Sequence, residues 1–390
     1  MKKWLKILLL VLAFCATFLC ATVLTLYRVD AQLTPAELKS TEIAQYLDAY
    51  FIDDYDEETM ADAVADAMVA ATGDRWSYYL PASEKVRYDE QMQNAYVGIG
   101  VTITLDEEAG GMRIMSVTDG GPAAEAGIQP DDVVIEVEGE STLTLGMEGT
   151  RTSVRGEAGT FVTLTMLRAD ERFTVSVERR SIETPVATYE MLDGQIGYIS
   201  IENFDTRCAQ ETNAAIDALV QQGAVGLIFD VRFNGGGYKD ELVEVLDKLL
   251  PEGELFRAED YAGRVETDVS DAACLELPMV VLVNEDSYSA AEFFAAALQE
   301  YGWASVVGTK TVGKGNFQTA FELSDGSLLN LSIGKYYTPQ GRSLTDVGVT
   351  PDIEVTLGDE ELTQLYYDRL PPDEDAQLQA AIREIRRKIT

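Results

Sequence analysis

Hydrophobic positions along the chain recur with two different periods, and the change between them divides the sequence into regions. From Thr34 to about Asn94 apolar residues recur at helical spacing, as in "AELKSTEIAQYLDAYF" and "EETMADAVADAMVAA". The turn signal Thr72-Gly73-Asp74 predicts the end of the second helix. We therefore expect a helical N-terminal region over residues 30–94.

Residues 95–182 alternate between apolar and polar positions as strands do. Short runs broken by glycine, proline and aspartate predict a compact β-rich module; they read "YVGIGVTITL", "GMRIMSV", "DVVIEVEG", "FVTLTML" and "RFTVSVER". The loop at Gly98, Ile99 and Gly100 leads into a strand, and its backbone N–H groups could bind the terminal carboxylate of a peptide. A hairpin with a glycine bulge is the structural alternative.

Residues 183–360 combine apolar strands with amphipathic helices. The runs "IGYISI", "VGLIFDV" and "PMVVLVNE" are apolar enough to be buried on both faces, which is typical of strands in α/β domains. In the C-terminal region, residues 361–390, the segment "DAQLQAAIREIRRK" predicts a terminal helix. The pattern thus predicts an α/β domain next to a smaller β-rich one.

Residues 1–29 differ from the rest of the chain in charge and hydrophobicity. Three lysines among the first six residues precede an uncharged run over residues 7–27, which is longer than the apolar part of a cleavable signal and about as long as a bilayer span. Because positive charges stay on the cytoplasmic side, we expect a membrane anchor with the body of the protein on the extracytoplasmic side. Cleavage near residues 29–31 would instead give a secreted protein.

Composition excludes several kinds of chemistry. The 390 residues include 67 acidic and 30 basic side chains, a net charge of −37, so the chain lacks the basic surface that nucleic-acid binding needs. There is no histidine, which removes Ser-His-Asp and Cys-His catalysis and every histidine-containing metal site. The cysteines form no CxxC pair, and neither a metal nor a cofactor is indicated. A disulfide between Cys208 and Cys274 is compatible with the sequence but not required by it.

A serine stands where a buried strand turns into a helix. In "VLVNEDSYSAAEFFAAALQEYG" the strand ends at Asn284 and an alanine-rich helix begins near Ser289, a place where α/β enzymes expose nucleophiles. The segment Ser289-Ala290-Ala291-Glu292 also fits a capping box, in which the serine only starts the helix. The turn therefore has a catalytic and a structural interpretation.

Two further segments could serve a serine nucleophile without histidine. "GLIFDVRFNGGGYKDELVEVL" leads a buried strand into three glycines, whose N–H groups could converge on an oxyanion; a flexible loop is the alternative. Lys314, within "TVGKGNFQ", could act as the base, because lysine is the known substitute for histidine. Such a lysine must be neutral, which requires a dry environment. The alternative is a solvated turn lysine.

Taken together, these segments resemble the carboxyl-terminal processing peptidases, which are tail-specific serine peptidases with a built-in PDZ domain. The resemblance covers nearly the whole chain beyond the N-terminal segment, in the family's order. It rests on "VGIGV", "GPAAEAGIQPDDVVIEVEG", "GLIFDVRFNGGG", "SYSAAEFFAAALQEYG", "VGKGNFQ", "LLNLSIGKYYTPQGRSL" and "GVTPDIEV". It implies a crotonase-like α/β peptidase domain over residues 183–360 and an inserted PDZ domain over residues 95–182.

By position in these motifs, the resemblance implies a role for each candidate residue. Ser289, the middle of the family's three alternating serines, would be the nucleophile, and Ser287 corresponds to the first. Lys314 would be the general base, and Gln318 would orient it. The backbone N–H groups proposed for the oxyanion hole are those of Gly236 or Gly237 and Ala290. The PDZ carboxylate loop would be Gly98, Ile99 and Gly100.

The sequence departs from the family pattern at three places. Ala291 replaces the third serine, which argues only against a role for that hydroxyl. The glycine loop reads Asn-Gly-Gly-Gly where the family usually has proline before two glycines. Gly146 and Gly149 weaken the helix expected beside the PDZ groove, so the side-chain specificity of that groove is open.

The resemblance implies a serine endopeptidase that uses a Ser–Lys dyad to cleave exported or membrane proteins near their C-termini. Its partners would be unfolded or C-terminally exposed proteins and the membrane, with no nucleic acid, metal or cofactor. The family's N-terminal helices often mediate dimers, so we hypothesise a homodimer through residues 34–94. Two alternatives stay open: a non-catalytic PDZ scaffold on a peptidase-like fold, and a crotonase-type acyl-CoA enzyme, in which a PDZ module would have no purpose.

Overall fold

The computed structural model describes residue 4 and residues 34–169, 171–367 and 369–389. The chain divides into two compact units, residues 1–79 and residues 80–390. Apart from Trp4, the anchor predicted over residues 1–29 lies outside the described residues. Across the described ranges, no helix is both long and apolar enough to cross a membrane.

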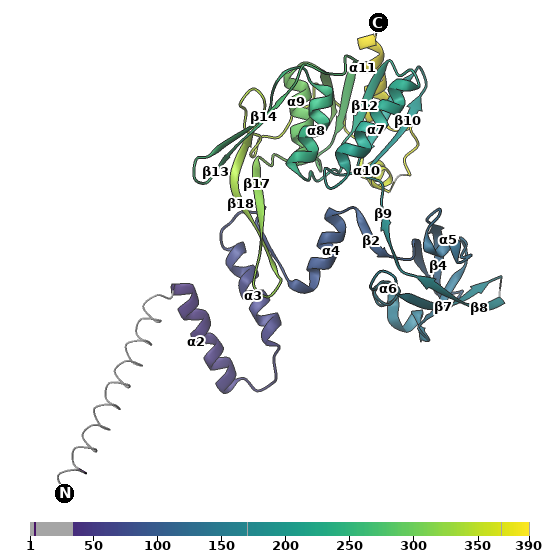
Figure 1. Cartoon of the computed structure of the whole chain (residues 1–390), viewed down its shortest axis with the longest axis vertical. Helices are drawn as coiled ribbons and strands as arrows, with labels where there is room; N and C mark the ends of the chain where they lie inside the picture. The colour runs from purple at the N-terminus through teal and green to yellow at the C-terminus, as the bar shows by residue number, and fades with distance from the viewer. Residues whose placement is uncertain (1–3, 5–33, 170, 368, 390) are drawn as a thin grey trace. The chain divides into compact units, whose positions relative to one another are not determined.

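The N-terminal unit contains the two helices that the apolar spacing predicts. Its elements are α2 (Pro35–Tyr50), α3 (Glu57–Ala70) and β1 (Tyr78–Leu80), whose last residue belongs to the second unit (Figure 1). A capping box starts α2, because Glu37 N donates to the Thr34 hydroxyl at 3.4 Å and Thr34 N donates to the Glu37 carboxylate at 2.6 Å. Both helices lie wholly within the described residues, and neither buries any of its side chains.

The β-rich module forms an antiparallel sheet with two helices. In spatial order its strands are β3 (Val101–Asp106), β4 (Gly111–Val117), β5 (Val133–Val137), β7 (Phe161–Arg168) and β8 (Glu171–Glu178), with β6 (Glu140–Ser141) beside β5. The helices are α5 (Pro122–Glu125) and α6 (Thr142–Val154). Alternate residues such as Ile114, Val134 and Leu164 point inward and form the core, as the period of two predicts.

Gly146 and Gly149, which were expected to weaken helix α6, differ in their effect on it. Gly146 has φ 68° and ψ −177°, which interrupts the helix with a kink. Gly149 keeps helical geometry, so only one of the two glycines breaks the helix. The segment after Gly146 continues to Val154 and remains available to form one wall of a groove.

The chain enters and leaves the module through neighbouring segments. Helix α4 (Ala82–Met92) leads into β2 (Ala95–Gly98), which pairs antiparallel with β9 (Arg180–Glu183). Arg207 donates to the carbonyl oxygen of Gln93 at 2.9 Å and to that of Thr184 at 2.7 Å. Both connections are therefore held at one place, an arrangement that suits a domain inserted into another.

The α/β domain is built on a six-stranded sheet. In spatial order its strands are β10 (Ala187–Leu192), β11 (Ile196–Ile201), β12 (Gly226–Asp230), β15 (Met279–Val283), β16 (Ala304–Gly308) and β19 (Ile353–Glu354). Only β10 runs antiparallel to its neighbour. The expected buried parallel strands are present: every residue of β12 and β15 is buried.

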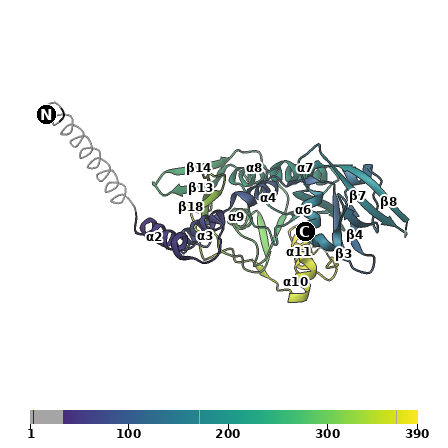
Figure 2. The same ribbon diagram turned by 90° about the horizontal axis from the view of Figure 1, so that it is seen from below.

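Helices cover both faces of this sheet. On one face are α7 (Cys208–Gln221), α8 (Lys239–Leu249) and α9 (Ala290–Glu300); on the other is α11 (Ala376–Ile389). Figure 2 shows α7 and α8 along one side of the domain and the yellow α11 on the opposite side. Successive strand residues face the two layers alternately: Phe229 and Val281 pack toward α9, and Ile228 and Leu282 pack toward α11.

A second antiparallel sheet carries the segment that contains Lys314 and Gln318. Its strands include β13 (Gly253–Asp260), β14 (Val265–Ser270), β17 (Asn316–Glu322) and β18 (Leu328–Tyr337). A short helix, α10 (Asp359–Tyr366), precedes α11. Cys208 is a buried free thiol and Cys274 a half-buried one, so the disulfide that the sequence allowed between them is not formed.

Candidate active site

Ser289 lies at the turn between β15 and α9, as the sequence predicts. It occupies the N-cap position of α9 with φ 60° and ψ −121°, a combination that costs a residue with a Cβ about 1–3 kcal/mol. Its side chain is half-buried, whereas Ala290 and Ala291 behind it are buried. The backbone strain thus holds a hydroxyl at the surface end of an otherwise buried helix.

Ser287 has a different environment. Its side chain is completely buried, and its hydroxyl donates to Val231 O at 2.7 Å. The same oxygen accepts from Asn284 N at 3.1 Å. Ser287 therefore ties the end of β15 to the residue that follows β12, a structural role consistent with Ser289 being the reactive serine.

The glycine loop packs directly against Ser289. A Cβ atom added to Gly236 would lie 2.7 Å from the Ser289 Cβ and 2.8 Å from Ala290 N. Asn234 joins the two segments, because its carbonyl oxygen accepts from Tyr288 N at 3.1 Å. The side-chain oxygen of Asn234 accepts from Gly236 N at 2.8 Å, so this N–H is already engaged. Of the candidate oxyanion donors, Gly237 and Ala290 are therefore better placed than Gly236.

Glu292 joins the serine turn to the lysine loop. Its carboxylate is completely buried and accepts from Ser289 N at 3.1 Å, Gly313 N at 2.7 Å and Lys314 N at 2.8 Å. The Thr311 hydroxyl donates to the same carboxylate. Burial raises the pKa of Glu292, and these hydrogen bonds act in the opposite direction. The capping-box motif indicated only the bond to Ser289; the bonds to residues 19 to 22 positions away required the fold.

Lys314 lies close to the same turn. Its Nζ atom is 5.8 Å from the centroid of the Tyr288 ring, and its side chain is half-buried. The Tyr336 hydroxyl donates to Lys314 O. Burial and the charge of Glu292 raise the pKa of Tyr336, and a hydrogen bond with the Ser289 side chain opposes this rise. Tyr336 is thus a contact of both candidate catalytic residues that the sequence did not single out.

Gln318 lies on β17, four residues after Lys314. Its Nε2 atom donates to Asn316 O and to Ser332 Oγ, each at 3.1 Å. These bonds fix the amide on the strand pair β17–β18, so its carbonyl oxygen has a defined orientation. The role of orienting Lys314 stays a prediction.

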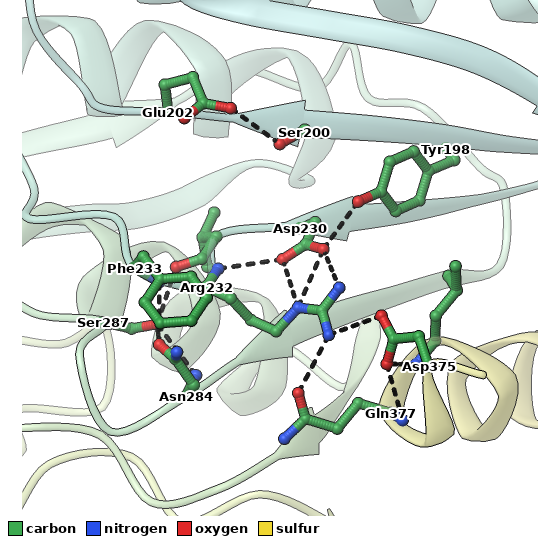
Figure 3. A network of polar contacts seen from close by, with 12 residues as sticks. Tyr198, Ser200, Glu202, Asp230, Arg232, Phe233, Asn284, Ser287, Asp375 and Gln377 are labelled. Atoms are coloured by element: carbon green, nitrogen blue, oxygen red, sulfur yellow. Dashed lines mark hydrogen bonds and ion pairs between the residues drawn. The ribbon is translucent and has the colours of Figure 1, made fainter. Parts of the chain in front are cut away.

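A buried ion-pair network holds the residues just before the glycine loop (Figure 3). Arg232 pairs with Asp230 at 2.5 Å and with Asp375 at 2.8 Å, and all three side chains are almost completely buried. Tyr198 donates to Asp230 at 2.7 Å, and Gln377 accepts from Arg232 at 3.1 Å. Because Arg232 precedes the glycine loop and Asp375 begins the last helix, the network fixes the loop to the C-terminal region. No pattern in the sequence indicated this network.

The loop predicted to bind a carboxylate borders a groove in the β-rich module. Gly98, Ile99 and Gly100 line a pocket of about 310 Å³, together with α6 residues. Gly100 has φ +78°, and a Cβ there would lie 3.1 Å from Thr118. Arg155, just after α6, also lines the pocket and pairs with Glu90 at 2.9 Å. The groove is therefore bordered by the glycine loop on one side and by residues of α6 on the other.

These features define a class of protein: a candidate serine hydrolase on a mostly parallel α/β sheet, with a separate β-rich module that carries a groove. Comparison with known proteins gives the family. Residues 195–355 match peptidase family S41, and residues 113–168 match a PDZ domain. The chain belongs to peptidase family S41.

Relatives and a solved structure agree with this assignment. The carboxy-terminal processing protease CtpA of Bacillus subtilis is 32% identical over 307 residues, 78% of this chain and 66% of its own length. The carboxyl-terminal-processing protease of a Synechocystis strain is 34% identical over 293 residues, 73% of this chain and 67% of that protein. A Bacteroides fragilis structure described as an S41 protease has the same fold, with a TM-score of 0.52, 19% identity, and coverage of 83% of this chain and 90% of that one. This chain spans just under two thirds of the Bacillus relative.

Proposed function

We propose that this protein is a serine endopeptidase that cleaves exported or membrane proteins near their C-termini, with Ser289 as nucleophile and Lys314 as general base. The observation that carries the proposal is the buried Glu292 carboxylate, which accepts from the backbone N–H of both residues. A single rigid anchor for nucleophile and base is what a preorganised dyad needs.

In the proposed reaction, neutral Lys314 takes the proton from the Ser289 hydroxyl as its oxygen attacks the scissile carbonyl carbon. The carbonyl oxygen becomes an oxyanion, which the N–H groups of Gly237 and Ala290 would stabilise. Lys314 then gives the proton to the leaving amine as the C–N bond breaks. Water, deprotonated by Lys314, hydrolyses the acyl-enzyme and restores Ser289.

The PDZ groove would bind the C-terminal tail of the substrate. Gly98, Ile99 and Gly100 supply the proposed carboxylate loop, and Arg155, which is paired with Glu90, lines the same pocket. Tail binding there would deliver the nearby chain to Ser289 and explain cleavage close to a C-terminus.

The proposed membrane location and the proposed homodimer both rest on the N-terminal region of the chain. We propose that residues 7–27 anchor the protein in the membrane with its body on the extracytoplasmic side. Apolar residues that α2 exposes, such as Ile43 at 52% and Tyr46 at 60%, support the proposed homodimer through residues 34–94.

A non-catalytic PDZ scaffold is the competing function. The strained backbone at Ser289 favours an enzyme, because an ordinary N-cap serine has extended backbone geometry and needs no positive φ.

Incubation of the full chain with an unfolded protein tests the proposal, with cuts mapped by mass spectrometry. Ser289→Ala should abolish cleavage, and Ser287→Ala serves as the matched control, since it should keep substantial activity. An active Ser289→Ala variant would refute the proposed nucleophile.

A further inference from the structure

A pocket of about 410 Å³ opens beside the serine turn and is walled by three segments. Phe233 leads into the glycine loop, and Asp286 and Tyr288 belong to the turn that ends at Ser289. Tyr366 and Tyr367 come from the end of α10. Because Tyr288 is next to Ser289 in the chain, the pocket borders the turn that carries the candidate nucleophile.

Aromatic rings make up most of the wall. Tyr366 meets Phe233 edge to face, with centroids 5.4 Å apart and planes at 78°, and meets Tyr367 at 5.2 Å and 85°. Tyr366 and Tyr367 are 63% and 59% exposed, so large ring surfaces face solvent rather than a packed core. A ligand side chain that covered these rings would remove considerable apolar area from water.

The turn side of the pocket is held in place by one buried side chain. Asn284 is completely buried, and its Oδ1 atom accepts from Phe233 N at 2.9 Å and from Asp286 N at 3.2 Å. The backbone N–H groups of Phe233 and Asp286, two residues of the pocket wall, are thus held by the same oxygen atom. The pocket is therefore preformed on its turn side, as ligand sites usually are.

The charge of the lining favours one class of side chain. Asp286 is the one charged residue among the described residues that line the pocket, and it is exposed. Aromatic faces attract cations, and a carboxylate next to them completes a site for a basic group. The net charge of −37 also attracts basic segments to the protein. An acidic side chain would be repelled by Asp286, and an apolar one would gain nothing from this carboxylate, which water solvates.

We propose that this pocket is a substrate subsite for a lysine or arginine side chain close to the scissile bond. The methylene stem would lie against the rings of Phe233 and Tyr366, and the cationic end would pair with Asp286. This inference rests on the proposed peptidase function and names the substrate side chains that the site prefers.

The test begins with the full chain and an unfolded protein, whose mapped cuts should show lysine and arginine enriched at one fixed position near the cleaved bond. Peptides that carry lysine, norleucine or glutamate at that position, and are otherwise identical, then give kcat/KM values. We expect lysine to exceed norleucine by about two- to fivefold, as an exposed ion pair allows, and glutamate to be cleaved least. Asp286→Asn should bring the lysine-to-norleucine ratio close to one.

Asp359→Asn is the matched control, since Asp359 is exposed on the same helix as Tyr366, lies outside the pocket lining and carries the same charge. It should leave the ratio unchanged. The proposal would be overturned if the wild type cleaved the norleucine peptide as fast as the lysine peptide. It would also be overturned if the lysine-to-norleucine ratio fell equally in Asp286→Asn and Asp359→Asn, because the preference would then come from net charge. Absence of any cleavage would refute the peptidase function itself, a result distinct from cleavage without preference.

Discussion

The Oε2 atom of Glu292 lies 2.8 Å from the backbone nitrogen of Lys314 and accepts its hydrogen bond. Glu292 stands in the first turn of α9, and Lys314 stands in the loop that precedes β17, 22 residues later. This contact joins α9, which begins at the candidate nucleophile Ser289, to the loop that contains the candidate base Lys314. The distance between the two candidate catalytic side chains therefore depends on one buried carboxylate.

Glu292→Gln should lower kcat while the protein stays folded. A glutamine has one acceptor oxygen and a donor NH₂ group, which would face N–H groups that now donate to the carboxylate, so the lysine loop should shift. We expect a loss of stability of about 1–3 kcal/mol and a fall in kcat of at least tenfold. Measurements of urea unfolding and peptide cleavage check both. Glu361→Gln, on the exposed first turn of α10, is the control. Equal kcat values in the two variants would show that catalysis does not need the hydrogen bonds to the Glu292 carboxylate.

Lys314→Arg should give a folded and inactive protein. Arginine keeps the positive charge but does not release its proton in a protein, so it cannot act as a base. The measurement is cleavage of one unfolded substrate between pH 6 and 10 by both forms. Lys310→Arg, at an exposed lysine in the same segment, should keep wild-type activity. Retained activity in Lys314→Arg would reduce Lys314 to a turn residue and Ser289 to a helix cap.

Gly236→Ala should abolish activity through a clash with the nucleophile. The residue has φ +89°, and its added Cβ would approach the Ser289 Cβ to 2.7 Å. Gly263→Ala is a control for backbone strain alone, because Gly263 has φ +75° and no atom within 4 Å of the added Cβ. Both variants should lose about 1 kcal/mol of stability from strain, and only Gly236→Ala should lose cleavage. Activity in Gly236→Ala would show that the loop can move away from Ser289.

Asp205 should make stability depend on pH. Burial, with a smaller contribution from the charge of Glu241, raises the pKa of Asp205 to about 7. The folded chain therefore binds a proton that the unfolded chain has released, so the free energy of unfolding should fall as pH rises from about 4 to about 7. The total fall is at most roughly 4 kcal/mol.

Asp205→Asn should flatten this dependence, as measured by urea unfolding at pH 4.5, 6 and 8. Asp240→Asn, whose side chain is 89% exposed, should leave it intact. A stability profile that is the same in Asp205→Asn and the wild type would show that Asp205 titrates normally in the folded protein.

The local pattern of the sequence was enough to predict where elements form and where chemistry could lie. Apolar runs such as residues 226–230 and 279–283 are short and have few polar positions, which is typical of buried strands, so the α/β sheet could be predicted. The serine turn was predictable for the same reason, since Ser289 separates a buried strand from an alanine-rich helix. Family resemblance then linked Ser289 with Lys314, which periodicity alone could not do.

The tertiary structure decided everything that depends on contacts between distant segments. From the sequence, Glu292 could be interpreted only as a capping residue for Ser289, three positions earlier. Its hydrogen bonds to Gly313 and Lys314 form only when α9 packs beside the loop that precedes β17. Arg232 meets Asp375 across 143 positions for the same reason. Hydrophobic periodicity reports which face of an element is buried, but it carries no information about which element covers that face. The partners of buried charges are set by that packing, and so the geometry of the site was decided by the fold.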